Sequence, residues 1–232
     1  TRGSAPLRLV LNPLCTYRDY HGHTRGDGWA LQQSAIEGGC EINAFEGAQR
    51  YRLLTDRGAF APQPDWHWNF LHRAETARGL DDREDLFSPG TFVIQLACGE
   101  TVTLWLTTDT VPPTTSAIVF EIERRRQAEL LAAIAPDAPG WLKQLTLAAD
   151  QFIVRRDAVR VDGKPDRSAD AQVGHTVIAG YPWFSDWGRD TMIALPGLTL
   201  ATGRYDIAAN VLRTFGRFVS EGMLPNRFPD AG

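Results

Sequence analysis

The spacing of apolar residues changes at 111–115, Val-Pro-Pro-Thr-Thr, and this change separates two kinds of structure. Before it, β-branched and aromatic residues alternate with polar ones in short runs bounded by Gly, Pro, Asn and Asp, which is typical of strands. After it, apolar residues recur at intervals of three and four, which is typical of amphipathic helices. The sequence therefore predicts a β + α multidomain chain, with the β part first.

The β part is predicted at 1–117 as an antiparallel sheet or sandwich. Its clearest strand candidates are 7–11, 49–54, 91–96 and 101–106. The last two are joined by four residues that include a glycine, and such a link predicts a hairpin. The segment 65–90 is aromatic and charged, and it predicts one further strand followed by irregular structure.

Residues 118–138 are predicted to form a charged linker helix, because Glu121, Arg125 and Glu129 are spaced four apart and Pro136 ends the pattern. The remainder, 139–232, predicts three more helices. These cover 141–156, a run from Asp190 to Gly203 that Pro196 kinks or shortens, and 205–220.

Composition narrows the function classes. The net charge of −4 and the scattered Lys and Arg residues argue against a nucleic acid partner. No apolar run approaches the about 20 residues that span a bilayer, and the N-terminus lacks the pattern of a signal peptide. We therefore expect no membrane partner. The three cysteines are widely spaced, and we expect them to be reduced thiols, which fits a cytoplasmic location.

A metal site is not expected either. His21 and His23 are separated by one glycine, and no third ligand is spaced to complete a site. The sequence contains no other feature that calls for a metal or a cofactor, and we expect none.

Residue types suited to a ligand site are most concentrated in the twelve residues 180–191, which contain two Trp, a Tyr, a Phe, an Arg and two Asp. A pyranose site needs a flat apolar surface for C–H faces and planar hydrogen-bonding groups for adjacent hydroxyls. Trp183 and Trp187 can supply the surface, and Arg189 and Asp190 the planar groups. Asp190 also stands where a helix N-cap is expected, so the composition fits a capped, aromatic-lined loop equally well.

A second carboxylate, that of Asp186, lies near Arg189 in the same segment. Arg189 lies beside Asp190 and near Asp186, and charge-assisted hydrogen bonds to these two carboxylates are expected to orient its guanidinium.

The segment Ala179-Gly-Tyr-Pro-Trp-Phe-Ser-Asp-Trp-Gly-Arg-Asp-Thr-Met-Ile-Ala-Leu-Pro-Gly-Leu198 resembles the signature of the amylo-α-1,6-glucosidase family, the glucosidase part of glycogen debranching enzymes of the bacterial and archaeal type. Its Trp-Gly-Arg-Asp-Thr core is the most specific part. Further segments are similar to the same family: 147–154 and 221–230 to its catalytic domain, and 17–21 and 78–81 to its N-terminal β domain.

The resemblance implies a β-sandwich-like domain followed by the first helices of an incomplete (α/α)6 barrel. Residues 139–232 form this first part of the barrel. It also implies an inverting hydrolase that removes α-1,6-linked glucose from glycogen or limit dextrin, with α-glucan as the partner. Inversion needs two carboxyl groups about 6.5–9.5 Å apart.

The resemblance places both of these carboxyl groups beyond Gly232, so this chain is expected to be inactive alone. It makes Trp183, Trp187, Arg189 and Asp190 substrate-binding residues. The rival assignment makes Asp190 the general acid. The adjacent Arg189 argues against it, because a positive charge lowers a carboxyl pKa and a general acid needs it raised.

Two other functions remain open at this point. One is a non-catalytic glucan-binding module that only holds polysaccharide. The other is a different (α/α)6 glycosidase, such as a glucoamylase relative, acting on other linkages.

Overall fold

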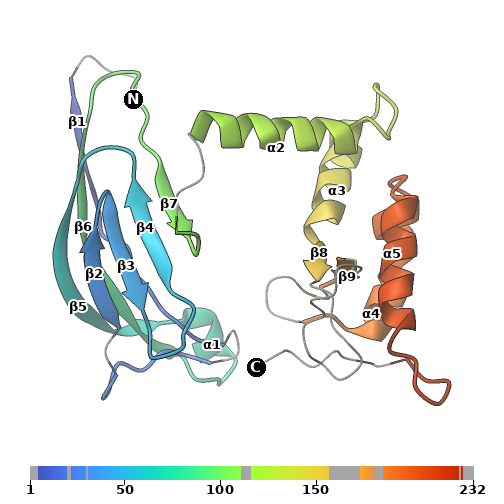
Figure 1. Cartoon of the computed structure of the whole chain (residues 1–232), viewed down its shortest axis with the longest axis horizontal. Coiled ribbons are helices and arrows are strands. Elements are labelled where there is room, and N and C mark those ends of the chain that lie inside the picture. The colour runs from blue at the N-terminus through green and yellow to red at the C-terminus, as the bar shows by residue number, and fades with distance from the viewer. Residues whose placement is uncertain are drawn as a thin grey trace. The chain divides into compact units, whose positions relative to one another are not determined.

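The computed structural model describes residues 5–19, 22–29, 31–110, 116–156, 173–178, 180, 185–224 and 226. The chain divides into two compact units, Thr1–Val119 and Phe120–Gly232 (Figure 1). The first is rich in antiparallel strands and the second is mainly helical. The β-rich N-terminal part predicted from the alternating apolar residues is therefore confirmed.

Two antiparallel sheets build the first unit. One has three strands in the order β1-β6-β5, and the other has four in the order β2-β3-β4-β7. A short helix, α1, lies between β5 and β6. The elements are β1 Leu7–Leu11, β2 Gln32–Ile36, β3 Gly39–Asn43, β4 Tyr51–Thr55, β5 Ala59–Leu71, α1 Arg73–Ala77, β6 Arg83–Leu96 and β7 Leu104–Thr107.

The two sheets share one hydrophobic core. Ile42 and Leu53 come from the four-stranded sheet, and Phe92 and Ile94 come from the three-stranded sheet. Each of the four is at most 1% exposed. Because side chains alternate between the faces of a strand, every second residue of these strands enters the core and leaves its neighbour on the outer face.

The predicted hairpin between 91–96 and 101–106 is wrong. β6 pairs with β1 and β5, whereas β7 pairs with β4, so the link carries the chain from one sheet to the other. The carboxylate of Glu100 does accept a hydrogen bond of 2.7 Å from the backbone N–H of Ala97, which closes a local turn. The turn is thus formed by neighbouring residues, whereas the two strands that it joins pair within different sheets of the common core.

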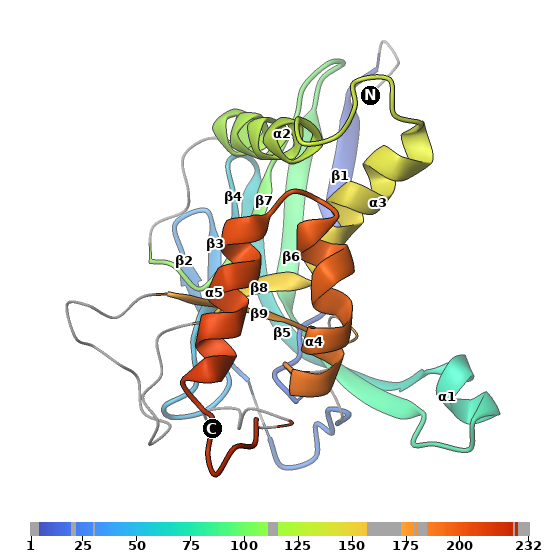
Figure 2. The ribbon, with the colours of Figure 1, turned by 90° about the vertical axis from the view of Figure 1, so that its right-hand side faces the viewer.

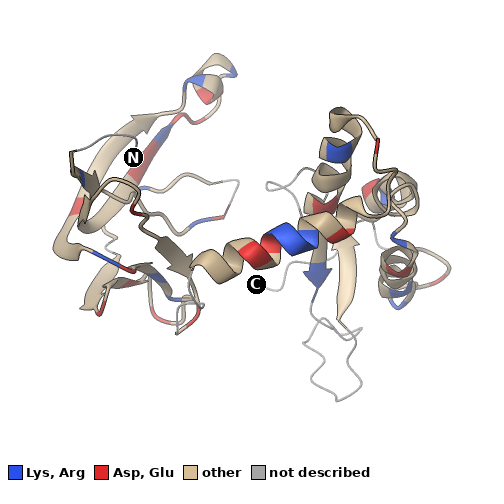
Figure 3. Cartoon of the chain, turned by 90° about the horizontal axis from the view of Figure 1, so that it is seen from above, with Lys and Arg blue, Asp and Glu red and all other residues tan. Residues whose placement is uncertain are grey.

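The second unit contains four helices, one turn of π-helix and a short hairpin among its described residues. Its elements are α2 Ser116–Leu131, α3 Gly140–Gln151, β8 Ile153–Arg156, β9 Gly174–Val177, α4 Gly188–Leu195, the π-helical turn η1 Pro196–Leu200 and α5 Tyr205–Gly216. Here α2 begins just before the boundary between the units. Acidic and basic residues follow one another along α2 (Figure 3), and none of its residues is buried.

A small core joins α4 and α5. Leu195 at the end of α4 packs with Ala208, Val211 and Phe215 of α5. Figure 2 shows these two helices beside one another, and both contact strand β9. No helix in the described ranges is long and apolar enough to cross a bilayer.

The helix predicted at 141–156 is too long. It ends at Gln151, and Ile153–Arg156 form strand β8, which pairs antiparallel with β9. β-branched Ile153 and Val154 suit an extended strand. The helix predicted from Asp190 begins at Gly188 instead, and α4 ends at Leu195, directly before the proline that opens η1.

Candidate functional site

The predicted sugar-binding residues surround the start of α4. Trp187 is the N-cap residue of this helix and is partly buried, whereas Arg189 and Asp190 lie in its first turn and are exposed. Trp183 lies outside the described residues. We call the segment 185–191 the α4 corner.

Backbone contacts hold the α4 corner against the rest of the unit. Ile178 and Asp186 form an isolated antiparallel bridge. The N–H of Gly188 donates to the carbonyl of Asn226 at 2.8 Å. The hydroxyl of Thr191, which is fully buried, donates to the carbonyl of Val177 at 3.3 Å. The corner is therefore fixed both to the hairpin and to a distant part of the chain.

The N-cap role predicted for Asp190 is wrong. Helix α4 begins two residues earlier, so Trp187 occupies the N-cap without a side-chain cap hydrogen bond, and Asp190 is the third residue of the helix. Its carboxylate still lies near the positive end of the helix dipole, which favours a negative charge.

Asp186 plays a structural part that the sequence did not reveal. It is 2% exposed, and its Oδ2 accepts a hydrogen bond of 2.8 Å from Nη1 of Arg156 in β8. The prediction that Asp186 and Asp190 orient Arg189 is therefore wrong. Within the described part of the chain, the Arg189 side chain makes no hydrogen bond or ion pair with either carboxylate. The contact between Arg156 and Asp186 was not predictable from the sequence, because 29 positions (157 to 185) lie between the two residues.

Two adjacent residues of opposite charge thus lie exposed at the corner. Considering only the described residues, neither Arg189 nor Asp190 has a side-chain hydrogen bond or ion pair. A guanidinium offers paired donors and a carboxylate offers paired acceptors, and together they match adjacent hydroxyl groups without adding net charge. This arrangement can bind a neutral polyhydroxyl ligand.

Two other carboxylates of the second unit, those of Glu123 and Asp150, form ion pairs. Asp150 lies between Arg126 and Arg204, with Oδ1 2.8 Å from Nη1 of Arg204. These residues line a cavity of about 370 Å³ between α2, α3 and the turn before α5. Because both oxygens of Asp150 contact guanidinium groups, it links these elements. Among the residues that the structure describes, no cluster of three His, Cys, Asp or Glu side chains could hold a metal ion.

Comparisons with known proteins point in one direction. Residues 147–232 match the family model described as amylo-alpha-1,6-glucosidase, and residues 1–103 match the model described as glycogen debranching enzyme N terminal. The chain belongs to the glycogen debranching enzyme family. The first of these matches contains the end of α3 from residue 147, all of α4 and α5, and the whole α4 corner.

A curated member of this family is also similar. The glycogen debranching enzyme of Saccharomyces cerevisiae is 40% identical over 62 residues, which cover 25% of this chain and 4% of that protein. The chain thus corresponds to only a small part of the yeast relative. No solved structure matches it significantly. The two family models leave out residues 104–146, where α2 lies.

Proposed function

We propose that this chain is part of an inverting glycoside hydrolase that removes α-1,6-linked glucose from glycogen or limit dextrin. The observation that carries the proposal is the exposed Arg189 and Asp190 pair at the start of α4, inside the part that matches the amylo-alpha-1,6-glucosidase model. In this proposal α-glucan is the partner, and the α4 corner binds the glucose whose bond is cleaved.

The corner supports binding more than it supports proton transfer. Asp190 and Arg189 are exposed next to each other in the first turn of α4, and together they offer acceptors and donors to adjacent hydroxyl groups. The carboxyl groups that act as general acids lie instead in apolar pockets. We therefore assign Asp190 and Arg189 to glucose hydroxyls, Trp187 and Trp183 to the wall of the pocket, and the catalytic acid and base to other parts of the whole enzyme.

The division of the chain follows from the same proposal. Residues 1–117 are a β-sandwich-like domain, 118–138 a linker helix, and 139–232 the first helices of an (α/α)6 barrel. The helices α3, α4 and α5 and the position of α2 between the two family matches support this division. A cytoplasmic location is part of the proposal, and the two buried thiols of Cys15 and Cys40, which form no disulfide, support it.

The test is Asp190→Asn in the whole enzyme that contains this chain. The matched control is Asp206→Asn, since Asp206 is also an exposed carboxylate in the first turn of a helix, α5. We expect the Asp190 variant to release glucose from limit dextrin more slowly and with a higher KM. Azide should not restore its activity, and the Asp206 variant should behave like the wild type.

Two results would contradict the proposal. If Asp190→Asn keeps its rate on an activated aryl glucoside but loses it on natural branches, Asp190 is the general acid. If the wild-type enzyme releases glucose from linear maltooligosaccharides but not from limit dextrin, the debranching activity itself is wrong.

A further inference from the structure

The outer face of the four-stranded sheet carries two parallel rows of side chains. The register pairs Ile36 with Gly39, Gly39 with Leu54 and Leu54 with Trp105, so these four residues form a row across β2, β3, β4 and β7. The row lies opposite the core, because its neighbour Leu53 belongs to the core cluster. Since Gly39 has no side chain, the row is low in its middle, and Leu54 and Trp105 stand side by side.

A polar row lies beside the apolar one. The register pairs Ser34 with Glu41, Glu41 with Arg52 and Arg52 with Thr107. Arg52 and Glu41 form an ion pair, and their side chains are only 16% and 15% exposed. Arg52 also donates to the backbone carbonyl of Asp109 at 2.6 Å.

Glu41 is held in its charged form. A hydrogen bond of 2.9 Å from Arg50, together with the contact to Arg52, keeps the pKa of Glu41 below its ordinary value although burial acts in the opposite direction. The pair is thus ordered before any ligand arrives, which reduces the entropy lost on binding.

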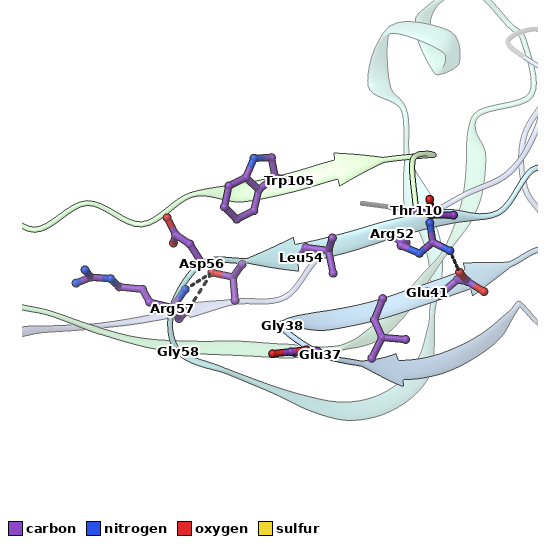
Figure 4. Close-up of a pocket in the computed structure, with 12 residues that line it drawn as sticks. Glu37, Gly38, Glu41, Arg52, Leu54, Asp56, Arg57, Gly58, Trp105 and Thr110 are labelled. Carbon is purple, nitrogen blue, oxygen red and sulfur yellow. Dashed lines mark hydrogen bonds and ion pairs between the residues drawn. The ribbon is translucent and has the colours of Figure 1, made fainter. Parts of the chain in front are cut away.

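A cavity of about 670 Å³ lies on this face of the sheet, lined by Ile36, Leu54 and Trp105 of the first row and by Glu41 and Arg52 of the second (Figure 4). Figure 4 shows Arg52 and Glu41 on one side of Leu54, and Trp105 and Asp56 on the other. The volume lies within the range of ligand pockets, about 300–1,000 Å³.

The charges of the cavity nearly cancel. Its lining contains three carboxylates, Glu37, Glu41 and Asp56, and two guanidinium groups, Arg52 and Arg57. A phosphate or a nucleic acid strand requires a clear excess of positive charge, which this lining lacks. The cavity instead combines a flat, partly exposed indole with paired donors and acceptors, and this combination suits a neutral ring with hydroxyl groups along its edge.

We propose that this cavity is a second α-glucan site, which binds two or three glucose units of a chain away from the α4 corner. The glucose ring stacks on Trp105, and its hydroxyls exchange hydrogen bonds with Arg52, Glu41 and Asp56. This inference rests on the proposed function for the identity of the sugar. The cavity itself is formed only by residues of the first unit, whereas the α4 corner belongs to the second unit.

The test follows the indole N–H signals of the seven tryptophans in a 15N NMR spectrum of the full chain titrated with maltoheptaose. Trp105→Phe and Trp187→Phe assign the two signals of interest. We expect the Trp105 signal to shift with maltoheptaose and to remain unchanged with a neutral polymer of similar size that lacks sugar rings. We also expect Trp105→Ala to weaken maltoheptaose binding to the first unit about tenfold.

The matched control is Leu106→Ala. Leu106 is the next residue of β7, is 71% exposed and faces away from the cavity side of the strand, so its substitution tests for damage to the edge strand alone. We expect it to leave the shift of the Trp105 signal and its midpoint unchanged.

The outcomes separate the two proposals. A shift at Trp187 without one at Trp105 overturns the second site and leaves the proposed function in place. A shift at Trp105 without one at Trp187 supports the second site and counts against the α4 corner as a glucose site. If neither signal shifts, the second site is overturned, including the case in which the cavity docks a protein segment instead of a glucan.

Discussion

The Asp186 carboxylate accepts a hydrogen bond of 2.8 Å from Arg156 and thereby ties strand β8 to the bend that precedes α4. The bond joins residues on either side of the segment 157–172. Asp186 precedes the exposed Arg189 and Asp190 by only three and four positions. Because Asp186 is 2% exposed, its charge needs this partner. The geometry of the proposed glucose site therefore depends on a residue that does not itself bind glucose.

Asp186→Asn is expected to destabilise the second unit. The change keeps the size of the side chain but removes the negative charge that lies 2.8 Å from the guanidinium of Arg156, which is 23% exposed. We expect the free energy of unfolding to fall by about 1–3 kcal/mol, measured by urea denaturation of the full chain.

The control for this change is Glu123→Gln. Glu123 also pairs with an arginine, Arg126, but both side chains are close to half exposed. Solvent screens such a pair, so its loss should change stability little. Equal destabilisation by the two variants would show that the burial of Asp186 does not matter.

Local patterns predicted the order of the two units and the positions of α2, α3 and α5, although they extended each of these helices beyond its observed end. The alternation in 7–11 and the three-and-four spacing in 205–220 each lie within one segment, and both elements are present, although the helix ends at Gly216. Strand pairing was not predictable in the same way. The link after β6 has the length and the glycine of a hairpin, but the partner of β7 is β4, which lies about 50 positions earlier in the sequence (Leu54 to Trp105).

The candidate site shows the same limit. Arg189 and Asp190 stood out because unusual residue types are concentrated in one short segment. The Asp186 and Arg156 pair and the pairing of β8 with β9 join residues far apart in the sequence, and the two rows of the sheet face are completed only by the pairing of β4 with the distant β7. No local spacing reveals them, because each is defined only once the chain has folded.

Gly58 is expected to be intolerant of any side chain. It lies in the turn between β4 and β5 with φ of 90°, and a Cβ there would lie 2.6 Å from the carbonyl oxygen of Val93. We expect Gly58→Ala to lower the free energy of unfolding by about 2–4 kcal/mol, through backbone strain and this clash. Thermal and urea unfolding followed by circular dichroism measure the effect.

Gly47→Ala separates the two causes. Gly47 has a similar φ of 85°, but none of the described residues places a heavy atom within 4 Å of the added Cβ. Its substitution should cost only the strain, about 1–2 kcal/mol. If both variants lose the same stability, the close approach to β6 is not what requires glycine at position 58.

Glu84 is expected to make the first unit sensitive to acid. Burial by itself raises the pKa of this carboxyl group, which is 3% exposed, but hydrogen bonds from Arg18 at 2.5 Å and from the Thr24 N–H at 3.3 Å hold the pKa below its ordinary value. Because the folded pKa is the lower one, the stabilisation is complete above the unfolded pKa and is lost as pH falls through the folded pKa.

Stability should therefore decline as pH drops below about 4.3, the unperturbed value of a glutamate. Denaturant unfolding at a series of acidic pH values measures this slope, and Glu84→Gln should flatten it. Glu46→Gln, which changes an exposed carboxylate of the same unit, is the control. An unchanged slope in the Glu84 variant would assign the acid sensitivity to other carboxylates.

The two buried thiols of the first unit are expected to limit its stability at high pH. Burial raises the pKa of Cys15 to about 11 and the pKa of Cys40 to about 12, and the two residues are 7% and 0% exposed. A thiol in the unfolded chain ionises near pH 8.5. The folded pKa is thus the higher one, so the stabilisation is complete below the unfolded pKa and is lost as pH rises towards the folded values.

The free energy of unfolding should therefore fall between pH 8.5 and 10, by up to about 1.4 kcal/mol per pH unit for each thiol. Urea denaturation under reducing conditions measures this slope, and the double variant Cys15→Ala/Cys40→Ala should flatten it. The slope is the informative quantity, because alanine also leaves a small cavity that lowers stability equally at every pH. Cys98→Ala, at an exposed position, should leave the slope as it is in the wild type. A slope that persists in the double variant would show that groups other than these two thiols release protons when the first unit unfolds.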